Sequence, residues 1–136
     1  MKTIADSGVI VAYLDKRDEH HRWTLEQIKT LPAPYSVCES VITESCFLLS
    51  HLHNGKKNVL AMLKAGFLTI DFSLSNEIEA VENLMQKYET VPLSLADACL
   101  VRMSKLIDNS SVFTLDSDFH IHRKNGKNKI PLIIPT

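Results

Sequence analysis

The chain has 136 residues, 45% of them apolar, and its 15 basic and 16 acidic residues leave a formal charge of −1. This size and composition fit one domain with a single core, which we expect to span residues 1–136. The charge excludes nucleic-acid binding through a general positive excess, so such a partner would require a local patch. No apolar run approaches the roughly 18 residues that a membrane span needs, so we expect a soluble protein.

The cysteines indicate a reducing compartment. They are three in number, are not arranged as C-x-x-C, and follow no secretory signal: Cys38, Cys46 and Cys99. An odd number without a framework spacing argues against structural disulfides. We therefore expect a cytoplasmic protein.

The first part of the chain predicts strands that alternate with helices. A short apolar run over residues 3–5 ends at Asp6, and residues 9–14 predict a helix. An amphipathic pattern over 23–31, closed by prolines, predicts a second helix, and 35–38 predict a second strand. Asp6 therefore stands at the carboxyl edge of a strand.

A third predicted helix carries an acid at the edge of its apolar face. Helical periodicity runs over residues 39–52 and is stopped by Asn54–Gly55. At about 100° per residue, Glu44 falls at the border of the apolar arc. This location suits an acid that lines a cleft, although a surface Glu beside an apolar stripe is equally compatible.

The middle of the chain repeats the alternation. Residues 56–65 predict a helix ended by a glycine, 67–70 predict a strand that finishes at Asp71, and 74–88 predict an amphipathic helix. Asp71 is thus a further carboxylate at a strand edge.

The next helix begins with a capping signal. Ser94 and Asp97 have the spacing of a capping box, with Asp in the place of the usual Glu or Gln. An acid in the first turn also complements the helix dipole. Asp97 therefore has a structural explanation, and a functional role needs further support.

The last part of the chain predicts two strands. The fourth begins at Ser110 and runs into Asp116 and Asp118, and the fifth, over 129–134, is expected at a sheet edge because it contains Pro131. Strands that alternate with helices predict a doubly wound parallel α/β sheet covered on both faces, with five strands and about six helices.

The recurring feature is an acid at a strand end, in a first helical turn or on a cleft-facing helix: Asp6, Glu44, Asp97, Asp116 and Asp118. Hard oxygen ligands suit Mg²⁺ or Mn²⁺ and not zinc. Carboxylates at close range raise each other's pKa unless a cation lies among them. Such an ion can activate water and stabilise a phosphoryl transition state, so the pattern favours phosphodiester hydrolysis.

Four motifs in this order resemble the PIN-domain ribonucleases. They are Asp6-Ser7 after the first strand, Glu44 in the third helix, Leu95-Ala96-Asp97-Ala98, and Thr114-Leu115-Asp116-Ser117-Asp118-Phe119. Together they span nearly the whole chain. The chain resembles in particular the small stand-alone kind that act as toxins of VapBC toxin–antitoxin pairs. The resemblance implies a three-layer α/β/α sandwich with a mostly parallel five-stranded sheet.

The resemblance also implies the chemistry. It implies an endoribonuclease with Mg²⁺ or Mn²⁺ as cofactor and in-line attack by a metal-activated water. The implied catalytic acids are Asp6, Glu44, Asp97 and Asp116; the implied metal ligands are Asp6, Asp97, Asp116 and Asp118, the last at a position that varies in the family; Ser7 and Thr114 are implied as supporting hydroxyls. RNA is the implied substrate, an antitoxin protein the implied partner, and homodimers are common in the family.

Basic residues near the end of the chain could contact RNA. They form a run without an acid: Arg123, Lys124, Lys127 and Lys129. A solvated loop explains the same run equally well. His120 and His122 are disfavoured as metal ligands among hard acids, so we expect them at the surface or behind the ligands.

Three alternatives were weighed. Asp116-Ser117-Asp118 mimics the D-x-D motif of haloacid dehalogenase-like phosphatases, but that motif opens the chain in that family and here it lies near the end. A receiver domain with Asp71 as phosphoacceptor would need an acidic pair where Asp6-Ser7 stands. A PIN-like module that binds RNA or protein without nuclease activity is the third.

Overall fold

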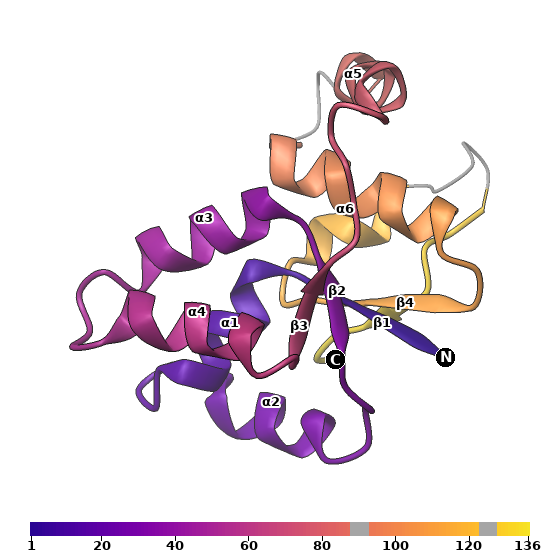
Figure 1. Cartoon of the computed structure of the whole chain (residues 1–136). Coiled ribbons are helices and arrows are strands. Elements are labelled where there is room, and N and C mark those ends of the chain that lie inside the picture. The colour runs from indigo at the N-terminus through magenta and orange to yellow at the C-terminus, as the bar shows by residue number, and fades with distance from the viewer. Residues whose placement is uncertain (88–92, 123–127) are drawn as a thin grey trace.

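A five-stranded, all-parallel sheet organises the chain (Figure 1). The structure is a computed structural model and describes residues 1–87, 93–122 and 128–136. The strands are β1 (Lys2–Ala5), β2 (Tyr35–Val37), β3 (Leu68–Ile70), β4 (Ser110–Phe113) and β5 (Leu132–Ile133), in the order β3-β2-β1-β4-β5. β5 lies at an edge, as predicted, but it is shorter than the predicted 129–134 and begins after Pro131.

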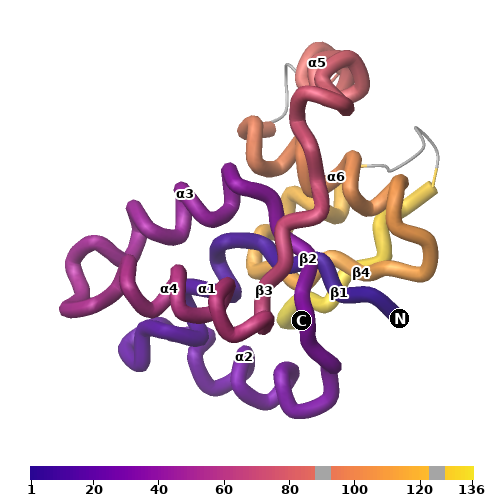
Figure 2. Tube along the Cα trace, viewed as in Figure 1, coloured from indigo at the N-terminus to yellow at the C-terminus, as the bar shows by residue number. Residues whose placement is uncertain are grey.

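Six α-helices and one 3₁₀ turn connect the strands within the described residues. They are α1 (Ser7–Leu14), α2 (His21–Ile28), α3 (Glu39–Leu48), α4 (Gly55–Lys64), α5 (Ile78–Lys87), α6 (Leu95–Leu106) and η1 (Ser117–His120). In Figures 1 and 2, helices α1, α2 and α4 lie together at the lower left of the molecule, and α5 packs on α6 at the upper right. The predicted α/β class is confirmed. No helix in these three described stretches is long and apolar enough to cross a membrane.

The core explains why the central strands form. The residues of β2 and β4 are buried throughout, which is typical of parallel strands covered on both faces. Phe113 lies at the centre, where its ring packs edge-on against Tyr35 at 6.0 Å and tilted against Trp23 at 5.8 Å. Trp23 thus belongs to the packing between α2 and the sheet.

Two predicted helices are shorter than expected. The helix predicted over 39–52 ends at Leu48, because the backbone then forms turns, in which the Ser50 N–H donates to the Phe47 carbonyl and the Leu52 N–H to the Leu49 carbonyl. The helix predicted from residue 74 begins at Ile78, because the Ser73 hydroxyl accepts the Asn76 N–H in a local turn.

The strand order changes direction at β1, because β2 and β3 are added on one side of it and β4 and β5 on the other. β2 lies on one side of β1 and β4 on the other, so β1 and β4 flank a topological switch point. In open parallel sheets, ligands bind in the crevice beyond the carboxyl ends of the strands at such a point. The residues that follow β1 and β4 are therefore the first place to look for a site.

Candidate active site

The carboxyl ends of β1 and β4 bring Asp6 and Thr114 together. Ala5 pairs with Phe113 in the strand register, so the next residues of both strands are neighbours. The Thr114 hydroxyl donates to Asp6 Oδ2 at 2.8 Å, and the Ser7 N–H donates to Asp6 Oδ1 at 2.7 Å. The carboxylate caps α1 and is only 5% exposed. Its orientation is fixed by these two donors.

The third helix supplies Glu44 through a contact with Ser7. The Ser7 hydroxyl donates to Glu44 Oε1 across the interface of α1 and α3. Glu44 is half-buried, so it lines a cleft rather than a solvated face. Of the two interpretations of its helical position, the structure favours the first.

Asp97 belongs to a capping box and also faces the site. Its N–H donates to the Ser94 hydroxyl at 3.1 Å, and its Oδ2 accepts the Ser94 N–H at 3.4 Å. The predicted capping box is therefore confirmed. The box places the carboxylate at the N-terminus of α6, beside the other acids. The structural explanation and a position in the pocket are therefore compatible.

Asp116 is held at the start of the 3₁₀ turn. Its N–H donates to the Thr114 hydroxyl at 3.0 Å, and its Oδ1 accepts the Asp118 N–H at 2.9 Å. Thr114 therefore connects Asp116 with Asp6 through one hydroxyl group. Asp118 contributes its backbone to this turn, and its side chain is not among those that line the cavity described next.

One open cavity of about 370 Å³ collects the predicted acids. Its lining consists of Asp6, Ser7, Gly8, Glu44, Ser94, Asp97, Leu115 and Asp116. The carboxylates come from four separate segments, namely the ends of β1 and β4, the middle of α3 and the start of α6. Ser94 was expected only as a helix cap, and its pairing with the candidate acid Asp97 was the signal that it would lie here.

The acids are electrostatically strained without a cation. Burial, with added repulsion from Asp97 and Glu44, raises the pKa of Asp6 to about 6, although the hydrogen bonds from Thr114 and Ser7 oppose the rise. Burial is also the main cause that raises the pKa of Asp97, and repulsion from Asp116 and Glu44 adds to it. Perturbed carboxyl groups in a cleft mark a candidate functional site.

The donor set fits a hard divalent cation held partly by water. All side chains that could act as ligands here carry oxygen. Within residues 1–87, 93–122 and 128–136, no three His, Cys, Asp or Glu side chains converge closely enough to hold a metal ion by themselves. Mg²⁺ usually keeps several waters and takes one or two carboxylates plus substrate phosphates, so this looser arrangement suits it.

Other predicted residues lie elsewhere. Arg123, Lys124 and Lys127 fall outside the described residues, and Lys129 is exposed. His120 is exposed, as expected.

His122 does not lie at the surface, which was one of the two places expected for it. This side chain is fully buried and its ring packs edge-on against Phe119 at 5.5 Å. A histidine that follows a short 3₁₀ turn can fill a core position, and residue type alone did not reveal this.

The fold and the pocket define an α/β protein with an acidic site at the switch point of a parallel sheet. The PIN domain family matches residues 3–125, so the chain belongs to the PIN domain family. The structure is similar to the VapC20 toxin of Mycobacterium tuberculosis, described as cleaving the sarcin–ricin loop, with a TM-score of 0.70, 16% identity, and coverage of 83% of this chain and 90% of that chain. A comparison with curated protein sequences gives no match. The predicted family is confirmed.

Proposed function

We propose that this protein is a Mg²⁺- or Mn²⁺-dependent endoribonuclease that hydrolyses RNA phosphodiester bonds and acts as the toxin of a toxin–antitoxin pair. One observation carries the proposal: four carboxylates from four separate segments of a PIN-family chain line one cavity at the switch point of the sheet. Repulsion among these acids is relieved by a bound cation, which gives the arrangement a chemical purpose.

Three of the acids are the proposed metal ligands. Asp6 follows β1, Asp116 follows β4, and Asp97 lies at the start of α6. Each carboxylate is oriented by hydrogen bonds. The bound cation would lower the pKa of water and stabilise negative charge on the phosphoryl group. Asp118, an implied ligand from family resemblance, is proposed instead to hold Asp116 through its N–H.

Glu44 is the proposed acceptor of a proton from the attacking water. Its carboxylate is oriented by the Ser7 hydroxyl, and Ser7 in turn follows the ligand Asp6. A general base must lie within hydrogen-bond reach of the proton that it accepts, and the contact with Ser7 orients the Glu44 carboxylate for this. Thr114 supports the site by binding Asp6 and Asp116 with one hydroxyl group.

The proposed partners follow from the family and from the resemblance to a toxin. RNA is the substrate, an antitoxin protein is the inhibitor, and a homodimer in the cytoplasm is the expected state. The similarity to VapC20 supports the class of ribonuclease toxin, and we do not extend its target to this chain.

A PIN-like binding module without nuclease activity is the second candidate. The observation that favours it is that two of the acids already have structural roles, because Asp6 caps α1 and Asp97 belongs to the capping box of α6. In this case the acids would serve only to position helices, and added metal would change nothing.

RNA cleavage separates the two candidates. The purified chain is incubated with RNA in EDTA, and then with Mn²⁺ or Mg²⁺ added in excess. We expect cleavage only after metal addition, and its loss in the Asp6→Asn variant. Cleavage in EDTA, or an equally active Asp6→Asn protein, would contradict the proposal; no cleavage under any condition would favour the binding module.

A further inference from the structure

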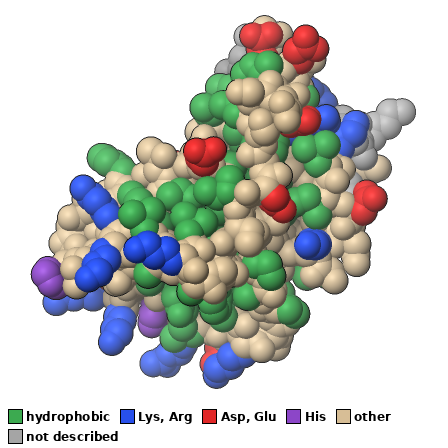
Figure 3. Space-filling view, viewed as in Figure 1, with side chains coloured by type: hydrophobic (Ala, Val, Ile, Leu, Met, Phe, Trp, Pro, Cys, Tyr) green, Lys and Arg blue, Asp and Glu red, His purple; other side chains and the backbone are tan. Residues whose placement is uncertain are grey.

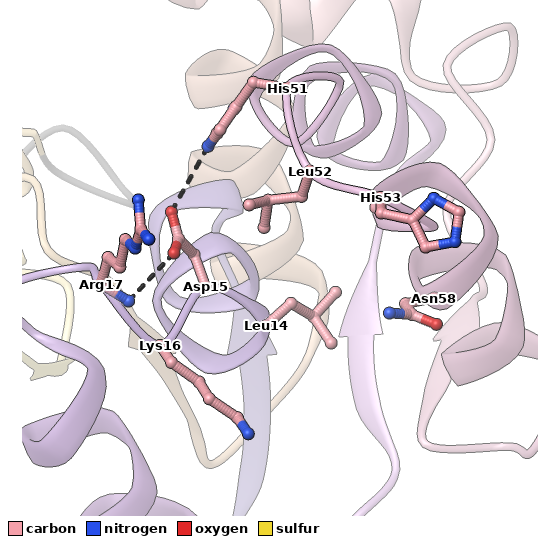
Figure 4. A pocket seen from close by; sticks show the side chains of 9 residues that line it. Leu14, Asp15, Lys16, Arg17, His51, Leu52, His53 and Asn58 are labelled. Carbon is pink, nitrogen blue, oxygen red and sulfur yellow. Dashed lines mark hydrogen bonds and ion pairs between the residues drawn. The ribbon is translucent and has the colours of Figure 1, made fainter.

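A second and larger cavity lies away from the acids, at the far end of α1. Its volume is about 590 Å³, within the range of small-ligand sites. The α1–α2 turn and the α3–α4 turn form it, and in Figure 1 both turns lie at the left of the molecule. Its lining is Leu14, Asp15, Lys16, Arg17, His51, Leu52, His53, Gly55 and Asn58 (Figure 4).

The lining carries two cationic side chains, Lys16 and Arg17, and one acid, Asp15, so we call it the basic cavity. Lys16 and Arg17 are exposed, and in the described part of the chain neither ammonium nor guanidinium group forms an ion pair. The adjoining first turn of α4 adds Lys56 and Lys57 without an acid. Figure 3 shows basic side chains gathered over α4 and the neighbouring lower left, whereas acids lie mainly in the upper and right parts of this face.

The single acid of the basic cavity is held by its neighbours. Asp15 accepts the Arg17 N–H at 3.0 Å and lies 3.5 Å from the His51 ring, and Figure 4 shows it between these two residues. The remaining surface combines apolar Leu14 and Leu52 with an amide and two imidazoles. A nucleotide needs cations to bind its phosphate, and apolar and ring surfaces to contact its base.

The basic cavity is close enough to the acidic pocket to act on the same strand. Ser7 lines one and Leu14 the other, and both belong to α1, so about 10 Å of helix separates them at 1.5 Å per residue. A single-stranded RNA of a few nucleotides is long enough to span this separation. One RNA could therefore occupy both.

We propose that the basic cavity binds the phosphodiester backbone of the RNA substrate beside the cleavage site, with Lys16 and Arg17 as the phosphate contacts. The proposal rests on the proposed ribonuclease function. An acidic protein segment would also pair with these cations, but the two imidazoles, the amide and the apolar side chains of the lining favour RNA.

Binding of fluorescent single-stranded RNA tests this inference. Affinity is measured in EDTA at several salt concentrations in the cleavage-deficient Asp97→Asn background, with and without the double change Lys16→Gln and Arg17→Gln. Lys64→Gln with Lys105→Gln is the matched control, because both lysines are exposed helix-end residues and the charge change is the same.

We expect the cavity variant to bind RNA about tenfold more weakly than the control variant, and its salt slope to fall by about 1.4, or 0.7 for each lost phosphate contact. Equal affinities of the two variants for the RNA would overturn the inference.

Two further outcomes separate this inference from the proposed function. If the unmodified chain never cleaves RNA but binding still depends on Lys16 and Arg17, the RNA site stands and the nuclease proposal fails. If polyglutamate displaces the RNA at lower concentration than unlabelled RNA does, and only when Lys16 and Arg17 are present, the cavity is a protein-binding site and the inference is overturned.

Discussion

Replacing Asp6 by Asn should stabilise the metal-free protein at neutral pH. The carboxylate is buried, and its pKa is raised from 3.8 to about 6. At about 1.4 kcal/mol per pKa unit, ionised Asp6 costs the folded state up to about 3 kcal/mol. Asn can preserve both contacts, because its oxygen accepts the Ser7 N–H and its amide can donate to the Thr114 hydroxyl.

The sign of the pH dependence follows from the raised pKa. Below pH 3.8 the carboxyl group is protonated in the folded and unfolded states, and the cost is absent. The cost develops as the pH rises from 3.8 towards 6 and is complete above that range. The advantage of Asp6→Asn should therefore be about 3 kcal/mol at most near pH 7.5 and about 1 kcal/mol near pH 4.5.

Urea denaturation in EDTA at these two pH values measures the difference, with Asp108→Asn as a control at an exposed acid. Added Mg²⁺ should reduce the difference in unfolding free energy between the two proteins. The ion binds the native state of the unmodified chain, which retains the Asp6 carboxylate, and stabilises it. An Asp6→Asn protein no more stable than the unmodified chain at pH 7.5 would refute the electrostatic reasoning.

Two more substitutions test the packing and the hydroxyl network. Gly55→Ala should lower the free energy of unfolding by about 1–3 kcal/mol, because its new Cβ would lie 2.1 Å from the Leu49 carbonyl oxygen; an unchanged urea midpoint would contradict this. Thr114→Val removes the hydroxyl that binds Asp6 and Asp116, and since this hydrogen bond lowers the pKa of Asp6, the acid limb of the pH–rate profile for RNA cleavage should move to higher pH. Superimposable profiles would show that the hydroxyl is dispensable.

The sheet was predictable because its signals are local. Short apolar runs that end in polar residues marked each strand, and Pro131 placed the last one at an edge. Helix ends were less predictable. Apolar spacing continues past Leu48 and precedes Ile78, but the turns after Leu48 and the turn at Ser73 decide where those helices end and begin.

The acids were predictable to a different degree. Asp6 and Asp116 follow strand ends, so the parallel topology alone brings them to one edge. Glu44 was ambiguous from periodicity, and its contact with Ser7 required the tertiary structure. Their place after the same strand did not separate Asp118 from Asp116; only the family resemblance, in which the position of Asp118 varies, did so.

The basic cavity could not be predicted at all. Lys16 and Arg17 belong to one turn and His51 and His53 to another, and neither turn has a motif of its own. Their proximity arises because α1 and α3 pack side by side and end at the same side of the molecule. Such sites depend on tertiary packing rather than on local pattern.

The central claim is that the four acids form one cation-dependent nuclease site, and the Asp97→Asn variant tests it most directly. Asn retains an oxygen that can accept the Ser94 N–H, so the capping box and the thermal stability should be preserved. With Mn²⁺ present, we predict a loss of RNA cleavage of about 100-fold or more, in line with removal of one charge-stabilising group. Full cleavage by a folded Asp97→Asn protein would contradict the account.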